Sequence, residues 1–115
     1  MKNIQALHER FTQDPVSVRL GGIAANFSRI ASFAFSPKNS RAVESMIEES
    51  KYFIEWTATE TSPDVQAFLV ELQVKLALLQ LRWPEISKDI SATKEIAQEA
   101  DKWSNSLLRF SGILS

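Results

Sequence analysis

The sequence has no cysteine and only one histidine, and these two shortages exclude several kinds of chemistry. Without cysteine the chain cannot form a disulfide, a thiolate metal site, an iron–sulfur cluster or a thioether link to a pigment. With His8 as its single histidine, it cannot build a metal site from two histidines. Glycine is also scarce, at three residues in 115, which leaves too few turns for an all-β fold.

An excess of charge of either sign is missing as well. The chain has 13 basic and 14 acidic residues and a formal net charge of −1, so no overall field attracts nucleic acid or anionic lipid. The most apolar region, residues 65–83, is interrupted by Glu71, Lys75 and Arg82, whereas a membrane span needs about 20 mostly apolar residues. Glu9 precedes any apolar run that could serve as a secretory signal. We therefore expect a cytoplasmic protein with no membrane association.

The prolines that are present divide the chain into segments of similar length. They lie 21 to 26 residues apart, at Pro15, Pro37, Pro63 and Pro84. Proline suits the first turn of a helix, and Asp or Ser just before it can accept bonds from the free amides beyond. Three pairs have this form: Asp14-Pro15, Ser36-Pro37 and Ser62-Pro63. The spacing predicts helices on the order of 30 Å long, joined by short turns.

Apolar residues recur in each segment at steps of three and four, as on one face of a helix. The four stripes run from Val16 to Ala34, from Val43 to Thr57, from Val65 to Trp83 and from Ile96 to Leu114. We predict an all-α fold: an up-and-down bundle of four long helices with a short N-terminal helix at 2–13, forming one helical-bundle domain over 1–115. The residues central to each stripe are expected to be buried together; they are Phe27, Ile54, Leu72 and Leu107.

Two helix boundaries are less clearly marked. The residue before a proline avoids the helical region, so the third long helix is expected to stop near Arg82. A short helical turn at 84–90 would then precede a last helix from about 91 to 111. Gly21 and Gly22 lie inside a predicted helix and cost roughly 1 kcal/mol each relative to alanine, which predicts either a kink or a closely packed neighbouring backbone.

Residue patterns for catalysis, metal binding and nucleic-acid binding are weak. Glu44, Glu48 and Glu55 share one side of a helix, but they point away from its apolar stripe and no Glu-x-x-His motif accompanies them, so a solvated face is expected. No sequence motif of a hydrolase, phosphate loop or zinc protease is present, and His8 is expected at the surface. We expect no enzyme, no cofactor and no metal site.

Arg19 and Arg29 are the best candidates for contacts with nucleic acid. They lie ten residues apart and could share a helix face. Phosphate binding usually needs a denser basic patch, so two solvated arginines are the favoured interpretation and nucleic acid is disfavoured as a partner.

The helix expected after Pro63 has a second apolar face, which a surface helix does not need. Its residues are Ala67, Val70, Val74, Ala77, Leu78 and Leu81. Two interpretations stay open: the N-terminal helix covers this face through Ile4, Leu7 and Phe11, or a second copy of the chain covers it in a homodimer. The predicted protein interface consists of Val70, Val74, Ala77, Leu78, Leu81, Tyr52 and Trp56.

The aromatic content suggests another possibility. Three tryptophans, seven phenylalanines and one tyrosine occur at helical spacing, where aromatic residues usually form core, yet bundle interiors can also hold ligands. The first hypothesis is a non-enzymatic protein-interaction module that self-associates. The alternative is a carrier or sensor of a small apolar ligand bound inside the bundle.

Two stretches resemble parts of known proteins. Residues 5–15, QALHERFTQDP, and residues 49–56, ESKYFIEW, are similar to small uncharacterised all-α proteins of cyanobacteria. This resemblance implies a helical cytoplasmic protein of cyanobacterial origin. It supplies no activity and no functional residues.

Overall fold

The computed structural model describes residues 3–112, which form five α-helices and two short 3-10 helices with no strand among them. In chain order the elements are α1 (Ile4–Thr12), α2 (Val16–Phe33), η1 (Pro37–Asn39), α3 (Ser40–Thr57), η2 (Ala58–Glu60), α4 (Pro63–Ile86) and α5 (Ile90–Ser111). No helix of this described part is both long and apolar enough to cross a membrane.

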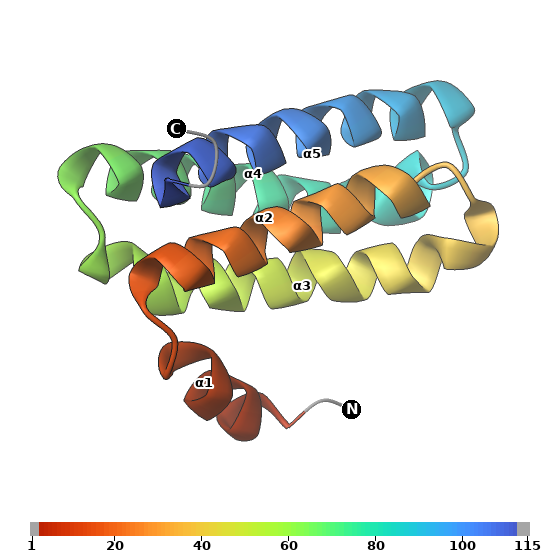
Figure 1. The fold of residues 1–115 in the computed structure, drawn as a ribbon. Helices are drawn as coiled ribbons and strands as arrows, with labels where there is room; N and C mark the ends of the chain where they lie inside the picture. The colour runs from red at the N-terminus through yellow and green to blue at the C-terminus, as the bar shows by residue number, and fades with distance from the viewer. Residues whose placement is uncertain (1–2, 113–115) are drawn as a thin grey trace.

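The helices α2 to α5 run alternately in opposite directions and form the predicted bundle (Figure 1). In this arrangement α5 lies along α2, and α3 lies along both α2 and α4. The shorter α1 projects from the bundle and packs against α3 (Figure 1). The prediction of an all-α bundle with a short leading helix is therefore confirmed.

The apolar stripes of the four long helices meet in one core, except at the end of the last stripe, where Phe110 is 42% exposed and Leu114 lies outside the described residues. Phe27, Ile54, Leu72 and Leu107 have at most 1% of their surface exposed, which confirms the prediction that they are buried. A polar group lies between α2 and α3, where the fully buried Asn26 donates to Glu49 and Ser50 and accepts a hydrogen bond from Arg29. Each polar atom of the Asn26 side chain thus has a partner, as burial requires.

The predicted helix starts are correct near Pro15, Pro37 and Pro63, but the predicted side-chain caps are wrong. Ser62 has the extended backbone of an N-cap, yet neither its hydroxyl nor that of Ser36 caps a helix. Asp14 also makes no cap, because Pro15 takes the N-cap position of α2. Side-chain caps occur instead at Asn3 and at Asp89, whose carboxylate accepts from the amides of Ser91 and Ala92. The proline pattern therefore marks the starts without specifying how the first amides are satisfied.

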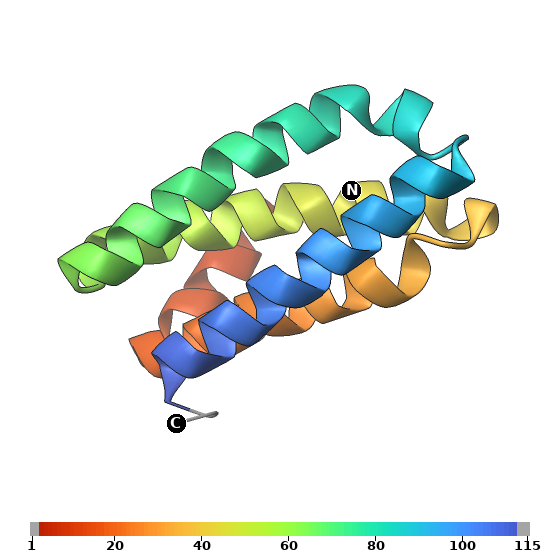
Figure 2. The same ribbon diagram turned by 90° about the horizontal axis from the view of Figure 1, so that it is seen from above.

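The predicted stop near Arg82 is wrong, because α4 continues through Pro84 to Ile86. The Trp83 side chain is 2% exposed, and its Nε1 donates to the Ser40 carbonyl at 2.9 Å. This tertiary anchor holds the chain helical where proline removes a backbone bond. Figure 2 shows α4 changing direction near its C-terminal end, as expected for a helix with an internal proline. The turn at residues 87–89 then leads to α5, which begins at Ile90, close to the predicted start.

Gly21 and Gly22 lie inside α2, which runs without interruption through both. A Cβ atom built on Gly22 would lie 3.7 Å from Cε1 of Phe11. The neighbour of Gly22 is thus an aromatic ring of α1 at ordinary contact distance, rather than the closely packed backbone that the sequence suggested.

Candidate functional site: the outer face of α4

The helix α4 has one apolar face inside the bundle and a second one outside it. The inner face consists of Val65, Leu69, Leu72, Leu76, Leu79 and Trp83, all buried. On the opposite side, four large apolar residues are between 53% and 78% exposed: Val70, Val74, Leu78 and Leu81. We call these four residues, with the exposed Ala67 and Ala77 beside them, the outer apolar face.

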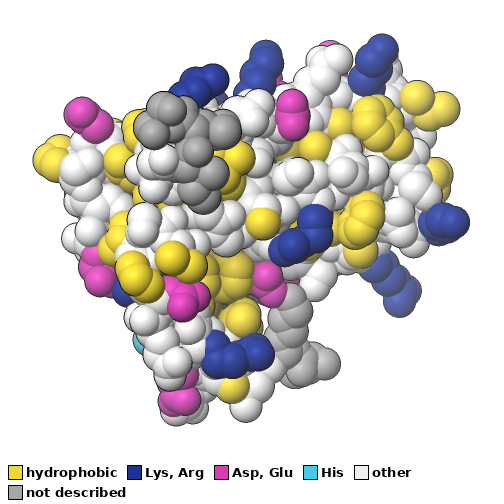
Figure 3. All heavy atoms as spheres, in the orientation of Figure 1, with side chains coloured by type: hydrophobic (Ala, Val, Ile, Leu, Met, Phe, Trp, Pro, Cys, Tyr) yellow, Lys and Arg dark blue, Asp and Glu magenta, His cyan; other side chains and the backbone are white. Residues whose placement is uncertain are grey.

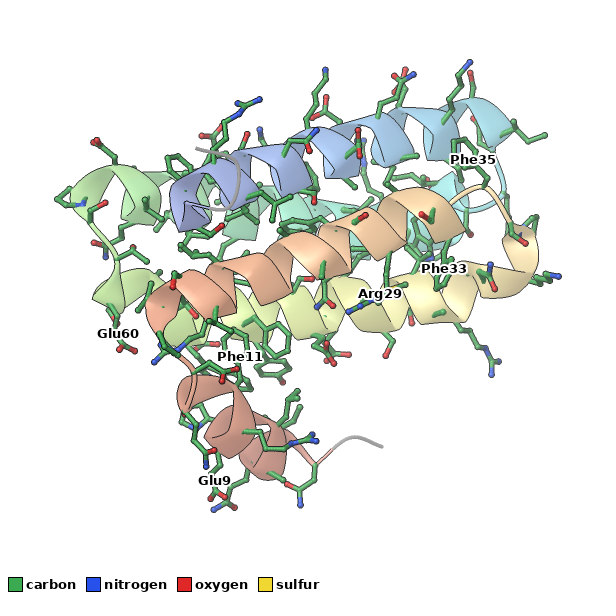
Figure 4. All side chains as sticks on the ribbon, viewed as in Figure 1. Glu9, Phe11, Arg29, Phe33, Phe35 and Glu60 are labelled. Atoms are coloured by element: carbon green, nitrogen blue, oxygen red, sulfur yellow. The ribbon has the colours of Figure 1, made fainter. Side chains whose placement is uncertain are left out.

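The short helix α1 does not cover the outer apolar face. Its Phe11 stacks on Phe53 of α3, with ring centroids 3.9 Å apart and an interplanar angle of 2°. Its His8 meets the ring of Trp56 edge-on at 4.7 Å. Figure 4 shows Phe11 pointing from α1 into the bundle on the α3 side. The interpretation that α1 covers this face within the same chain is therefore wrong.

The two aromatic residues assigned to the predicted interface lie on α3, next to α4. Tyr52 and Trp56 are half-buried, and their rings stack with centroids 5.5 Å apart. Trp56 packs against α1 through His8 and Phe11. Tyr52 lines a shallow cavity of about 200 Å³ together with Gln73 of α4. Of this pair, Tyr52 is thus the residue placed beside α4.

Polar residues border the outer apolar face on both sides. Toward α3, the Gln73 amide donates to the Lys51 carbonyl at 2.9 Å, and Lys51 Nζ donates to Gln80 at 2.8 Å. Toward α5, Glu71 and Lys75 form an ion pair at 3.2 Å. The glutamines thus bind the neighbouring helix, while the charged row on the other side remains in solvent.

A groove lies beyond this charged row, between α4 and α5. It has a volume of about 270 Å³ and is lined by Lys75, Leu78, Leu79, Arg82, Ile86, Ile96, Glu99 and Trp103. Its lining is mainly apolar, and Leu78 belongs both to the groove and to the outer apolar face. Sequence reasoning missed this groove, because its existence depends on how far α4 and α5 separate at this level of the bundle.

Arg19 and Arg29 do not form a shared basic face, contrary to one sequence hypothesis. Arg19 is 6% exposed and forms an ion pair with Glu60 at 2.8 Å. Its guanidinium also donates to the carbonyls of Asp14 and Thr12. Arg29 is exposed, and it donates to Asn26. The predicted pair of solvated arginines is thus wrong for Arg19.

The other sequence candidates lie at the surface. Glu44, Glu48 and Glu55 are exposed on α3, and His8 is exposed on α1. Among residues 3–112, no three His, Asp or Glu side chains are arranged to hold a metal ion.

Further exposed apolar side chains occur elsewhere, but they are more dispersed. Phe33 and Phe35 lie at the end of the bundle where α2 turns toward α3 (Figure 4). On the face seen in Figure 3, hydrophobic side chains are interspersed with charged and neutral polar ones. The outer apolar face differs because its residues follow one another on successive turns of a single helix.

No protein-family model, curated protein or solved structure matches the chain.

Proposed function

We propose that this protein is a non-enzymatic interaction module that forms a homodimer through the outer apolar face of α4. The supporting observation is the exposure of Val70, Val74, Leu78 and Leu81 along one helix, with α1 packed elsewhere. Contiguous apolar patches of this kind on soluble proteins mark interaction sites. Tyr52 is proposed to extend the contact at the α3 edge, with a smaller share from Trp56, which packs against α1.

A second copy is the simplest partner, because a two-fold axis brings the same face of both chains together. Burying apolar surface stabilises association by about 25 cal/mol per Å², before the loss of translational freedom is subtracted. The charged row with Glu71, Lys75 and Arg82 is exposed at the edge of the face. There it favours a correct register of the two copies without adding much affinity.

Sedimentation of the purified chain tests this proposal. We expect a dimer at micromolar concentration and a folded monomer for Leu78→Asp, because the buried carboxylate would have no partner in the interface. A matched control is Val18→Asp on α2, since Val18 is 52% exposed and Leu78 is 56% exposed. The control variant should remain dimeric. A wild-type chain that sediments as a monomer at high micromolar concentration would contradict the proposal.

A second proposed function is that of a carrier or sensor of a small apolar ligand. The observation that favours it is the groove between α4 and α5, whose lining is mainly apolar. The ligand site is then at the surface between two helices, rather than in the centre of the bundle, where the core side chains are close to fully buried. Ligand binding would raise the melting temperature of the protein.

A further inference from the structure

We infer that the groove between α4 and α5 binds a short aliphatic carboxylate, with its chain on the apolar floor and its carboxylate at Arg82. This inference rests on the second proposed function and adds the chemical class of the ligand. Three features of the groove support a ligand of this kind: its apolar floor, its volume and the charges along its two edges.

The floor of the groove is apolar and firmly held. Leu79 and Trp103 are 5% and 7% exposed, so both are fixed by the core behind them. Ile86 and Ile96 are half-buried and form the sides. Such a surface accepts an aliphatic chain, because it offers contacts to hydrocarbon and leaves few polar groups to desolvate.

The volume of the groove indicates how much of that chain it can accommodate. The groove measures about 270 Å³, just below the range of roughly 300–1,000 Å³ that is typical of drug-sized ligands. A methylene group is similar in size to a water molecule, which takes about 30 Å³ of liquid. The groove therefore has room for about nine methylene groups, and any longer chain would extend from its open side into solvent.

The charges at the edges favour an anionic head group. Lys75 and Arg82 lie on the α4 edge, and Glu99 lies on the α5 edge. Lys75 is paired with Glu71, whereas Arg82 has no hydrogen bond or ion pair with any of the residues that the structure describes. A guanidinium presents two parallel donors that match a carboxylate. Repulsion from Glu99 directs the head group away from α5 and toward Arg82.

Binding of three probes with the same ten-carbon chain tests the head group. Decanoate, decanol and decyltrimethylammonium are titrated below their micelle concentrations, and binding is followed by tryptophan fluorescence. Decanoate should bind about two- to five-fold more tightly than decanol, the range expected for one exposed ion pair. Decyltrimethylammonium should bind more weakly than either. Equal affinity for decanoate and decanol, or tightest binding of the cation, would overturn the inference.

Two pairs of variants locate the site. Arg82→Gln should remove the difference in affinity between decanoate and decanol. Arg109→Gln, which changes an exposed cation farther along α5, should preserve that difference. Ile96→Trp fills the groove and should weaken the binding of both probes. Ile90→Trp, at a position 84% exposed on the same helix, should leave the binding of both unchanged. An Ile96→Trp variant with unchanged binding would refute the groove as the site.

The outcomes separate the proposals from one another. If decanoate and decanol bind equally in the groove, ligand binding stands and the carboxylate inference fails. If neither probe binds, both fail. Sedimentation without any ligand decides self-association independently of these results.

Discussion

At the scale of single residues, Arg19 shows how one side chain joins distant parts of the chain. Its buried guanidinium donates to the carbonyls of Thr12 at 3.1 Å and Asp14 at 2.9 Å, and to Glu60 at 2.8 Å. It thereby ties the turn between α1 and α2 to η2. Lysine would not make the same bonds, because its three donors all lie on one nitrogen, whereas three separate nitrogens of the guanidinium reach these three acceptors. The sequence gives no sign of this role, since Glu60 lies 41 residues away.

The Arg19–Glu60 pair predicts a pH dependence of stability. The hydrogen bond from Arg19, and then the charge of its guanidinium, lower the pKa of Glu60 below its ordinary value. A carboxyl group whose pKa is lowered on folding stabilises the folded state above its unfolded pKa, and this contribution is lost as the pH falls through the folded pKa. Glu60→Gln should therefore lower the free energy of unfolding at pH 7, and this effect should become smaller as the pH is lowered toward about 2.

Urea denaturation of wild type and variant across this pH range measures the difference. Glu44→Gln serves as the control, because Glu44 is exposed on α3 and makes no ion pair with another described residue. The effect of Glu44→Gln on the free energy of unfolding should not decrease with falling pH as that of Glu60→Gln does. A Glu60→Gln effect that is equally large at pH 7 and pH 2 would show that the contribution does not come from the charged pair.

At the scale of helices, the N-terminal starts of α4 and α5 differ in how the free backbone amides of the first turn are treated. The Asp89 carboxylate accepts from the amides of Ser91 at 2.9 Å and Ala92 at 3.2 Å. At the start of α4, Ser62 makes no side-chain cap, and Pro63 supplies a residue whose missing N–H needs no partner. Asp89 and Ser62 thus occupy the same N-cap position of their helices, but only Asp89 binds the free amides of the first turn.

The difference between these two N-cap positions predicts different costs of truncating each side chain to alanine. Asp89→Ala should destabilise the protein by roughly 0.5–2 kcal/mol, as is typical for loss of a side-chain cap. Ser62→Ala should stay within about 0.5 kcal/mol of wild type, as for an ordinary surface change. Chemical denaturation of the two single variants provides the measurement. Comparable losses at both positions would mean that the Ser62 hydroxyl does bind the first turn of α4 in solution.

The sequence predicts those features of a helix that depend on residues close together in the chain, and it misses those that depend on distant contacts. The apolar stripes and the starts near proline depend on local spacing, and they are found as expected. The continuation of α4 past Pro84 depends on Trp83 reaching the Ser40 carbonyl, 43 residues away. The tendency of a helix to stop before Pro84 is therefore outweighed by the burial of Trp83. No pattern of neighbouring residues reveals that burial.

At the scale of the whole molecule, the sequence predicts the outer apolar face but not its surroundings. Leu78 and Leu81 stand out because a bundle helix needs only one apolar face. Whether α1 covers them depends on which helix Phe11 packs against. Phe11 stacks on Phe53 of α3, so α1 lies away from the outer apolar face. The groove beside Trp103 depends on the separation of two helices, a property of the assembled bundle rather than of either helix.

The two apolar faces of α4 predict different thermal behaviour of two leucine variants. Leu72 is 1% exposed in the core, and Leu78 is 56% exposed on the outer face. Leu72→Ala should cost about 2–5 kcal/mol through the cavity that it leaves, and it should lower the melting temperature at every protein concentration. If two copies associate, the melting temperature of the wild type should rise with concentration, because association stabilises the folded state by mass action.

Leu78→Asp should remove this concentration dependence while preserving the fold, whereas Leu72→Ala should keep the dependence. Scanning calorimetry over a hundred-fold range of concentration distinguishes the two effects. The core face then determines the stability of the single chain, and the outer face determines its response to a second copy. A melting temperature of the wild type that does not vary with concentration would leave the outer face without a role in self-association, even if Leu72→Ala behaves as expected.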